Sequence, residues 1–206
     1  MVDDELKGSM GRLWSLIEER SHAGADLARI DRRIWDLFGE DWAVMFTDLS
    51  GFSRSSAAFG ILHFLQIIHE QRKILLPLVR DHDGILIKED ADSFLILFRR
   101  PASAVSCAIA MQETCVRLNQ RRKPEEELLL CIGIGHGRIL RIGDREVYGV
   151  EVNAASKLGE DTAKAYEILC TDAVRAGAEG TPGVKDWVAL GEVAAGMGSA
   201  HRIEWR

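Results

Sequence analysis

The sequence predicts an α+β domain built on a mixed sheet, and three observations lead to this class. Helical and strand-like patterns alternate along most of the 206 residues. The segment ILIKEDADSFLILF, residues 85–98, places two apolar runs around an acidic turn and predicts a hairpin, so the sheet cannot be purely parallel. A hydrophobic content of 47% is enough for one substantial core.

The first forty residues predict a helical extension. Apolar side chains recur at helical spacing over residues 5–19 and again over 26–38, and SHAGAD separates the two runs. We therefore divide the chain into an N-terminal helical extension, 1–40, and a main domain, 41–206. The extension could pack on that domain or serve as a docking or dimerisation arm, and the sequence leaves both roles open.

The main domain is expected to begin with a buried strand, because WAVMFTD is a short run dense in large apolar residues. This places Asp48 at the end of a strand. A long helix is expected over 57–79, ahead of the hairpin, and Pro101 is well placed in the first turn of the helix that follows the hairpin.

The second half of the chain continues the alternation. LLLCIGIGHGRILRIGDREVYG, residues 128–149, predicts a buried strand, a glycine-rich interruption and a second strand. A helix should open in VEVNAASKLGED, and YEILCT predicts a short strand. The final HRIEWR is expected to form an edge strand of the sheet.

Composition excludes several classes of function. The net charge is −6 and the basic residues are scattered, so neither nucleic acid nor an anionic membrane is expected as a partner. The four cysteines form no CxxC pair, and three lie in apolar runs, which indicates reduced core thiols in a cytoplasmic protein. No stretch approaches the ~20 apolar residues that span a bilayer, so no membrane insertion is expected.

Two aspartates stand at junctions of strand and turn. Asp48 lies in FTDLSGF and Asp92 in KEDADSF, and a hairpin paired with the first strand would bring them together. Two carboxylates placed together repel unless a divalent cation lies between them, and hard oxygen ligands suit Mg²⁺ or Mn²⁺. The alternative is structural, since aspartate commonly ends strands and begins turns.

The turn after Asp48 adds a candidate anion site. Gly51 permits close backbone approach, and the N–H groups of residues 51–53 lead into the expected helix. Carboxylates beside an anion site suggest a nucleoside triphosphate, because Mg²⁺ in proteins often bridges carboxylates to phosphates. The sequence contains neither a GxxxxGK[ST] loop nor a protein-kinase signature.

Four blocks, in order and at comparable spacing, resemble the catalytic domain of the class III nucleotidyl cyclases, the adenylate/guanylate cyclase family. The resemblance covers residues 42–206, and its blocks are FTDLSGFS, GILIKEDADSFLILF, IGIGHGRI and EVYGVEVNAASKL. It implies a ferredoxin-like βαββαβ core with a largely antiparallel sheet. It also implies a head-to-tail dimer with sites at the interface, expected to be a homodimer, with a heterodimer as the alternative.

The resemblance assigns roles to single residues. Two Mg²⁺ or Mn²⁺ ions per site would be held by Asp48, Asp92 and the carbonyl of Leu49, while Gly51, Phe52 and Ser53 would cradle phosphates. The partner chain would supply Lys88 and Glu146 to recognise the purine. Asn153 would orient the ribose, and Lys157 would meet the charge that develops on phosphate.

The implied activity is conversion of ATP to 3′,5′-cyclic AMP and pyrophosphate. ATP is favoured over GTP because a lysine can donate to adenine N1 and a carboxylate can accept from the N6 amine. One metal ion would favour deprotonation of the ribose 3′-hydroxyl while the other neutralises the triphosphate.

The family pattern also breaks at several positions. Lys157 and Cys131 stand where the family has arginines, Ala195 where it has a basic residue, and Ala91 where it has glycine. Lysine keeps the charge but lacks the planar fork that grips two oxygens. The alternative is therefore a degenerate cyclase-like domain that binds nucleotide, or only dimerises, without turnover.

Overall fold

The computed structural model describes residues 8–51, 60–192 and 198–206. Its helices are α1 (Gly8–Ser21), α2 (Leu27–Phe38), α4 (Ile61–Asp81), α5 (Pro101–Asn119), α6 (Val150–Ser156) and α7 (Asp172–Gly177). Its strands are β1 (Gly39–Leu49), β2 (Ile85–Asp90), β3 (Ser93–Phe98), β4 (Leu130–Ile142), β5 (Glu146–Tyr148), β6 (Ile168–Thr171), β7 (Asp186–Glu192) and β8 (Ser199–Glu204). A 3₁₀ turn covers Pro124–Glu126, and a π-type turn, Lys157–Thr162, continues α6.

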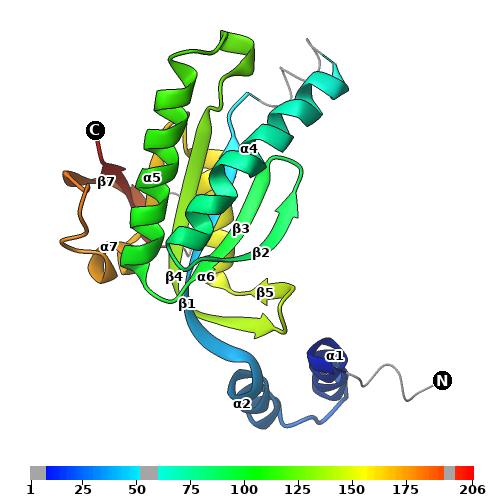
Figure 1. Cartoon of the computed structure of the whole chain (residues 1–206). Helices are drawn as coiled ribbons and strands as arrows, with labels where there is room; N and C mark the ends of the chain where they lie inside the picture. The colour runs from blue at the N-terminus through cyan, green and yellow to red at the C-terminus, as the bar shows by residue number, and fades with distance from the viewer. Residues whose placement is uncertain (1–7, 52–59, 193–197) are drawn as a thin grey trace.

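The strands form one sheet in the order β2-β3-β1-β4-β6-β8-β7, with β5 paired to β4 (Figure 1). The β4–β6 pair is parallel, and the other strand pairs among the described residues are antiparallel. The segment from β1 to β4 runs strand, helix, hairpin, helix, strand. The predicted α+β class, with a largely antiparallel sheet preceded by helices, is confirmed.

Different helices cover the two faces of the sheet. In Figure 1, α4 and α5 lie in front of the strands and α6 lies behind them. Apolar side chains of α4 and α5 pack with one face of β1, β3 and β4 to form the main core, which includes Met45, Leu75, Ile96, Met111 and Ile134. Trp42, Val44 and Ile139 pack on the opposite face with Ala155 of α6. Every second side chain of a strand points to the same face, so Asp48 shares the α6 face of β1 with Val44 and Phe46.

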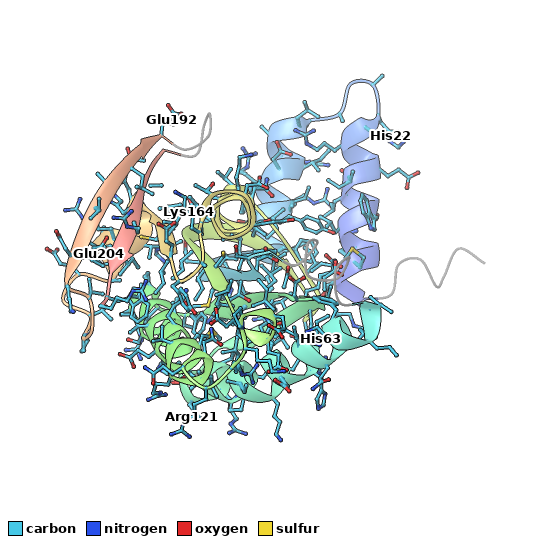
Figure 2. The ribbon with its side chains drawn as sticks, turned by 90° about the horizontal axis from the view of Figure 1, so that it is seen from above. His22, His63, Arg121, Lys164, Glu192 and Glu204 are labelled. Atoms are coloured by element: carbon cyan, nitrogen blue, oxygen red, sulfur yellow. The ribbon has the colours of Figure 1, made fainter. Side chains whose placement is uncertain are left out.

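The two predicted N-terminal helices are present and lie side by side, with His22 near their connection (Figure 2). They enclose a small core of their own, to which β4 contributes Ile142. Asp26 caps α2 by accepting a hydrogen bond from the backbone N–H of Arg29, at 3.0 Å. Because α2 ends at Phe38 and β1 begins at Gly39, no linker separates the helices from the sheet.

The predicted glycine-rich interruption after the buried strand is wrong, because β4 runs unbroken from Leu130 to Ile142. Its glycines instead allow α6 to approach the strand closely. A Cβ atom at Gly133 would lie 2.1 Å from the carbonyl oxygen of Ala155, and one at Gly135 would lie 2.4 Å from the carbonyl oxygen of Glu151. The glycines therefore mark a close contact between helix and strand.

The predicted position of the last strand is also wrong. β8 lies between β6 and β7, and β7 is the edge strand. β7 was not predicted because DWVALGE does not alternate apolar with polar residues, and most of its side chains are exposed. The helix expected over 57–79 is described from Ile61 to Asp81, and residues 57–59 lie outside the described residues.

The four cysteines are free and buried, as predicted, and are Cys107, Cys115, Cys131 and Cys170. Within the described ranges, no helix combines the length and the apolar character needed to cross a bilayer.

Candidate active site

Asp48 and Asp92 lie where β1 meets the β2–β3 turn. Asp48 is the penultimate residue of β1, and Asp92 directly precedes β3, which pairs with β1. Ser93 donates its hydroxyl hydrogen to Oδ1 of Asp48 over 3.0 Å, and the backbone N–H of Phe94 donates to Oγ1 of Thr47 over 3.3 Å. The turn that carries one aspartate is thus bonded to the strand that carries the other.

Burial and mutual repulsion make this pair of carboxylates costly to ionise. Burial, followed by the charge of Asp48, raises the pKa of Asp92 to about 7. Burial also raises the pKa of Asp48, although hydrogen bonds from Ser93 and from the backbone of Leu49 lower it in part. The charge of Glu160 also raises the pKa of both aspartates, and no cation of the described residues is among the causes of either shift.

This donor set fits a divalent cation. Carboxylate oxygens are hard ligands, and Mg²⁺ commonly takes one or two from protein while substrate phosphates and water complete its shell. Among the described side chains, no group of three or more histidines, cysteines and carboxylates could hold a metal ion by itself. Asp48 and Asp92 therefore suit an ion that arrives with substrate better than a closed structural metal site.

A pocket of about 400 Å³ opens on the α6 face beside the aspartates. Ser93, which bonds Asp48, lines the pocket together with Lys88 of β2. The opposite wall comes from the end of α6 and the turn after it, through Ser156 and Glu160. The other lining residues are Phe46, Asp90, Ala91 and Leu95.

Asn153 and Lys157 lie one helical turn apart, and both are exposed. Nζ of Lys157 lies 3.3 Å from Oδ2 of Asp161, and both side chains are about half exposed, at 47% and 61%. Lys157 therefore has an acidic partner of its own within the chain.

Lys88 and Glu146 occupy different levels of the sheet. Lys88 pairs with Leu95 of β3, which also pairs with Phe46 of β1, three residues before the end of that strand. Glu146 pairs with Ile142 on β4, beyond the first residue of β1. Their shared role in purine recognition stays a prediction.

The predicted phosphate turn is described only in part. Gly51 has φ +85°, a left-handed conformation that glycine adopts easily, and its chain neighbours apart, no atom of the described residues lies within 4 Å of where its Cβ would be. Phe52 and Ser53 lie outside the described residues, as does Ala195. Leu49 is buried at the end of β1, and the metal-ligand role of its carbonyl stays a prediction.

Two residues of β4 bear on the arginines that the family has and this chain lacks. Cys131 pairs directly with Asp48 across β1 and β4, and burial raises the pKa of its thiol to about 12. Arg138, a candidate replacement cation, donates from Nη2 to the carbonyl oxygen of Trp35 over 3.1 Å. Arg138 pairs with Asp41, seven residues along β1 from Asp48, so within its own chain it lies away from the carboxylates.

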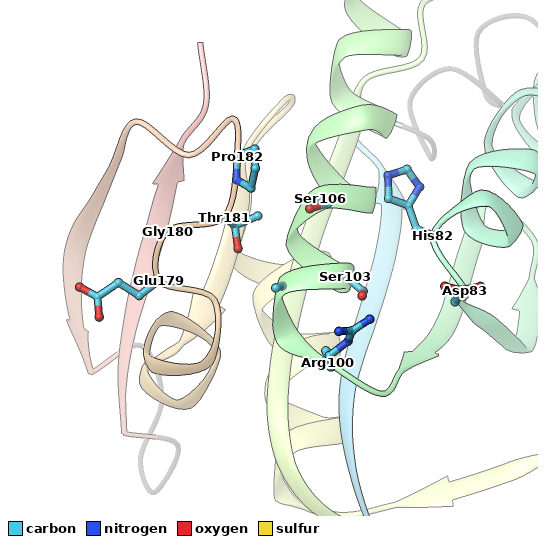
Figure 3. Close-up of a pocket in the computed structure, with 10 residues that line it drawn as sticks. His82, Asp83, Arg100, Ser103, Ser106, Glu179, Gly180, Thr181 and Pro182 are labelled. Carbon is cyan, nitrogen blue, oxygen red and sulfur yellow. The ribbon is translucent and has the colours of Figure 1, made fainter.

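Another pocket, of about 410 Å³, lies beside α5 (Figure 3). Ser103 and Ser106 of α5 line it between the turn with His82 and Asp83 and the loop at residues 179–182. Its lining mixes acidic, basic and hydroxyl side chains, and none of the residues predicted for the site belongs to it.

Three residues near the aspartates were not predicted from the sequence to belong to the site. Ser93 bonds Asp48, Glu160 adds negative charge near both aspartates, and Gln71 of α4 donates from Nε2 to the backbone carbonyl of Asp92 over 2.8 Å. Only Ser93 carried a signal in the sequence, because it follows Asp92 directly. Gln71 and Glu160 come from distant segments.

Curated relatives match part of the chain. Serine/threonine-protein kinase pkn2 from Myxococcus xanthus is 31% identical over 135 residues, which are 66% of this chain and 16% of that protein. Putative adenylate cyclase 3 from Rhizobium meliloti (strain 1021) is 27% identical over 116 residues, 56% of this chain and 20% of that protein. The chain thus spans a fifth or less of the length of these relatives.

Solved structures of both cyclase types share the fold. The adenylyl cyclase CyaB from P. aeruginosa has a TM-score of 0.70 at 21% identity, over 81% of this chain and 94% of that one. The guanylyl cyclase Cya2 has a TM-score of 0.66 at 18% identity, over 80% of this chain and 90% of that one. The fold alone therefore does not choose between ATP and GTP.

The family model described as "Adenylate and Guanylate cyclase catalytic domain" matches residues 39–185, from the first residue of β1 to the residue before β7. This match includes β1, the β2–β3 hairpin and α6, the elements that carry the predicted site. The chain belongs to the adenylate and guanylate cyclase catalytic domain family, the class III nucleotidyl cyclases.

Proposed function

We propose that this chain converts ATP to 3′,5′-cyclic AMP and pyrophosphate at the interface of a homodimer, in cyclic-nucleotide signalling. The observation that carries the proposal is that Asp48 and Asp92 lie together in a chain of this family, and that both carboxyls have a raised pKa with no cation of the described residues among the causes. Such a pair is unfavourable in isolation and becomes favourable once divalent cations neutralise it.

Asp48 and Asp92, together with the carbonyl of Leu49, would hold two Mg²⁺ or Mn²⁺ ions. When bound, these ions neutralise the triphosphate and favour the deprotonated ribose 3′-hydroxyl. Ser93 keeps Asp48 oriented and favours its ionised form through the bond from its hydroxyl.

The remaining residues bind and orient substrate. Lys88 and Glu146 would act from the partner chain, where Lys88 donates to adenine N1 and Glu146 accepts from the N6 amine. Asn153 orients the ribose, and Lys157 leaves Asp161 to meet charge on the phosphate. Gly51, Phe52 and Ser53 offer backbone N–H groups to the phosphates. The free, buried thiols support a cytoplasmic location.

The test is turnover by the purified chain. The protein is incubated with ATP or GTP and Mn²⁺ or Mg²⁺, and cyclic product is separated by chromatography. Asp48→Asn and Asp92→Asn should each abolish product. Asp83→Asn, in the exposed α4–β2 turn, is the matched control and should leave the rate unchanged. Absence of cyclic product from both nucleotides with both metals would exclude catalysis by the homodimer.

A second candidate is a cyclase-like domain that binds nucleotide without turnover. The ion pair of Lys157 with Asp161 and the buried Cys131 favour it, because cationic groups at these positions would otherwise stabilise the transferring phosphate. Tight ATP binding without product would select this candidate. Activity that returns only on addition of a second, arginine-bearing cyclase chain would indicate a heterodimer.

A further inference from the structure

We propose that Gln71 is a positioning residue. It holds the peptide between Asp92 and Ser93 so that the side chains of these two residues face the end of β1. This inference rests on the proposed function of Asp48 and Asp92 as metal ligands. Gln71 is fully buried in α4.

Gln71 occupies a core position of its helix. The buried residues of α4 follow a helical stripe that includes Ile67, one turn before Gln71, and Leu75, one turn after it. Oε1 of Gln71 has no hydrogen-bond partner among the described residues. Because an unsatisfied buried polar atom costs about 1–3 kcal/mol, stability alone favours an apolar side chain here.

Among the described residues, the side-chain amide of Gln71 makes one hydrogen bond, and that bond reaches the site. Nε2 donates to the backbone carbonyl of Asp92 over 2.8 Å. This carbonyl and the backbone nitrogen of Ser93 belong to the same planar peptide unit. One hydrogen bond therefore fixes the orientation of the peptide that joins Asp92, a carboxylate of the pair, to Ser93, the hydroxyl donor of Asp48.

The turn needs such a restraint because its backbone is strained. Ala91, between β2 and Asp92, has φ +49°, a left-handed conformation that is unfavourable for residues with a Cβ. Strain of this kind persists when surrounding contacts hold the backbone in place. Gln71 supplies such a contact from the helix on the opposite face of the sheet.

The chain contains a matched control. Gln112 of α5 is also fully buried, and its Oε1 also lacks a partner among the described residues. Its Nε2 donates to the backbone carbonyls of Leu130 and Glu167, at 3.0 Å and 3.2 Å. The two glutamines share burial and an unpaired oxygen, but the carbonyl bound by Gln71 belongs to a residue of the carboxylate pair.

The experiment compares Gln71→Met with Gln112→Met, because methionine keeps an unbranched side chain of similar length and removes the amide. Mn²⁺ affinity is measured by electron paramagnetic resonance in the presence of a non-cyclisable ATP analogue. Amide hydrogen exchange at Ser93 and Phe94 is measured in the metal-free protein. Gln71→Leu is the second variant, in case the methionine variant does not fold.

Gln71→Met should weaken Mn²⁺ binding about tenfold, the range for residues that orient metal ligands, and should accelerate exchange at Ser93. Gln112→Met should change neither. Mn²⁺ affinity within twofold of wild type, unaltered exchange at Ser93, or equal losses in both variants would each overturn the proposal. If Asp92→Asn binds Mn²⁺ as the wild type does, the proposed metal site fails, and exchange at Ser93 still decides whether Gln71 holds the peptide.

Discussion

The hydroxyl of Ser93 lies 3.0 Å from Oδ1 of Asp48, so a side-chain bond connects the β2–β3 turn to the end of β1. This bond lowers the pKa of Asp48 against the raising effect of burial. Ser93→Ala should therefore raise that pKa and weaken Mn²⁺ binding about tenfold, with a larger loss at pH 6 than at pH 8. Mn²⁺ titration at the two pH values measures the effect. Ser106→Ala on α5 is the control, and an equal loss there would contradict the prediction.

The stability of the metal-free protein should depend on pH through Asp92. Burial and the charge of Asp48 raise its pKa in the folded state to about 7, from the ordinary value of 3.8. Between these values the unfolded carboxyl releases its proton while the folded one keeps it, so the free energy of unfolding falls as pH rises from 4 to 7. Each unit of pKa difference corresponds to about 1.4 kcal/mol. Urea unfolding across this range should show the decline, and Asp92→Asn should reduce it; identical slopes would contradict the assignment.

Ala91→Gly should stabilise the protein by about 1 kcal/mol, because glycine adopts the φ of +49° without the steric cost of a Cβ. The control is Ala110→Gly in the middle of α5, which should destabilise by roughly 0.5–1 kcal/mol. Thermal unfolding of the two variants gives the comparison. A loss of stability in both would show that the backbone conformation at Ala91 is not the limiting factor.

Gly133→Ala should be strongly destabilising, since its Cβ would lie 2.1 Å from the carbonyl oxygen of Ala155 and 2.4 Å from the backbone nitrogen of Gly159. Backbone atoms cannot rotate away, so α6 must move from the sheet, at a cost of about 1–3 kcal/mol or more. Gly143→Asn is the control: its site is open, and asparagine tolerates its φ of +60°. Circular dichroism during urea unfolding measures both, and equal stability in the two variants would contradict the close contact.

Lys157→Arg should raise the rate of cyclic nucleotide formation roughly tenfold, because a planar guanidinium grips two phosphate oxygens where an ammonium acts as a point charge. The existing pair with Asp161 is half exposed, so breaking it costs little. The rate constant under saturating substrate is the quantity to compare. A rate unchanged from the lysine form would mean that residue 157 does not meet the reacting phosphate.

The sequence was informative wherever one local pattern decided the structure. The β2–β3 hairpin follows from two apolar runs around an acidic turn, and Pro101 marks the start of α5. The pattern misled at β4, where glycines that normally interrupt a strand instead make room for α6. No local signal distinguishes these two uses of glycine, because the helix that needs the space comes later in the chain.

The surroundings of the candidate site depend on contacts between distant segments. Asp48 and Asp92 stood out because each lies at a junction of strand and turn, beside an apolar run. Gln71 looked like one polar residue in a helix, and only the packing of α4 against the sheet brings its amide to the Asp92 carbonyl. Glu160 likewise reaches the aspartates because the turn after α6 lies over β1 and β4.

The burial of all four thiols makes this protein well suited to site-specific labelling. Burial raises the pKa of each to about 12, so the reactive thiolate fraction at neutral pH is on the order of 10⁻⁵. A single cysteine introduced at an exposed position such as Trp14 would then react with a maleimide dye or spin label against a silent background. With two such cysteines, the distance between their probes could follow the N-terminal helices during nucleotide binding, and no native residue of the core would have to be removed.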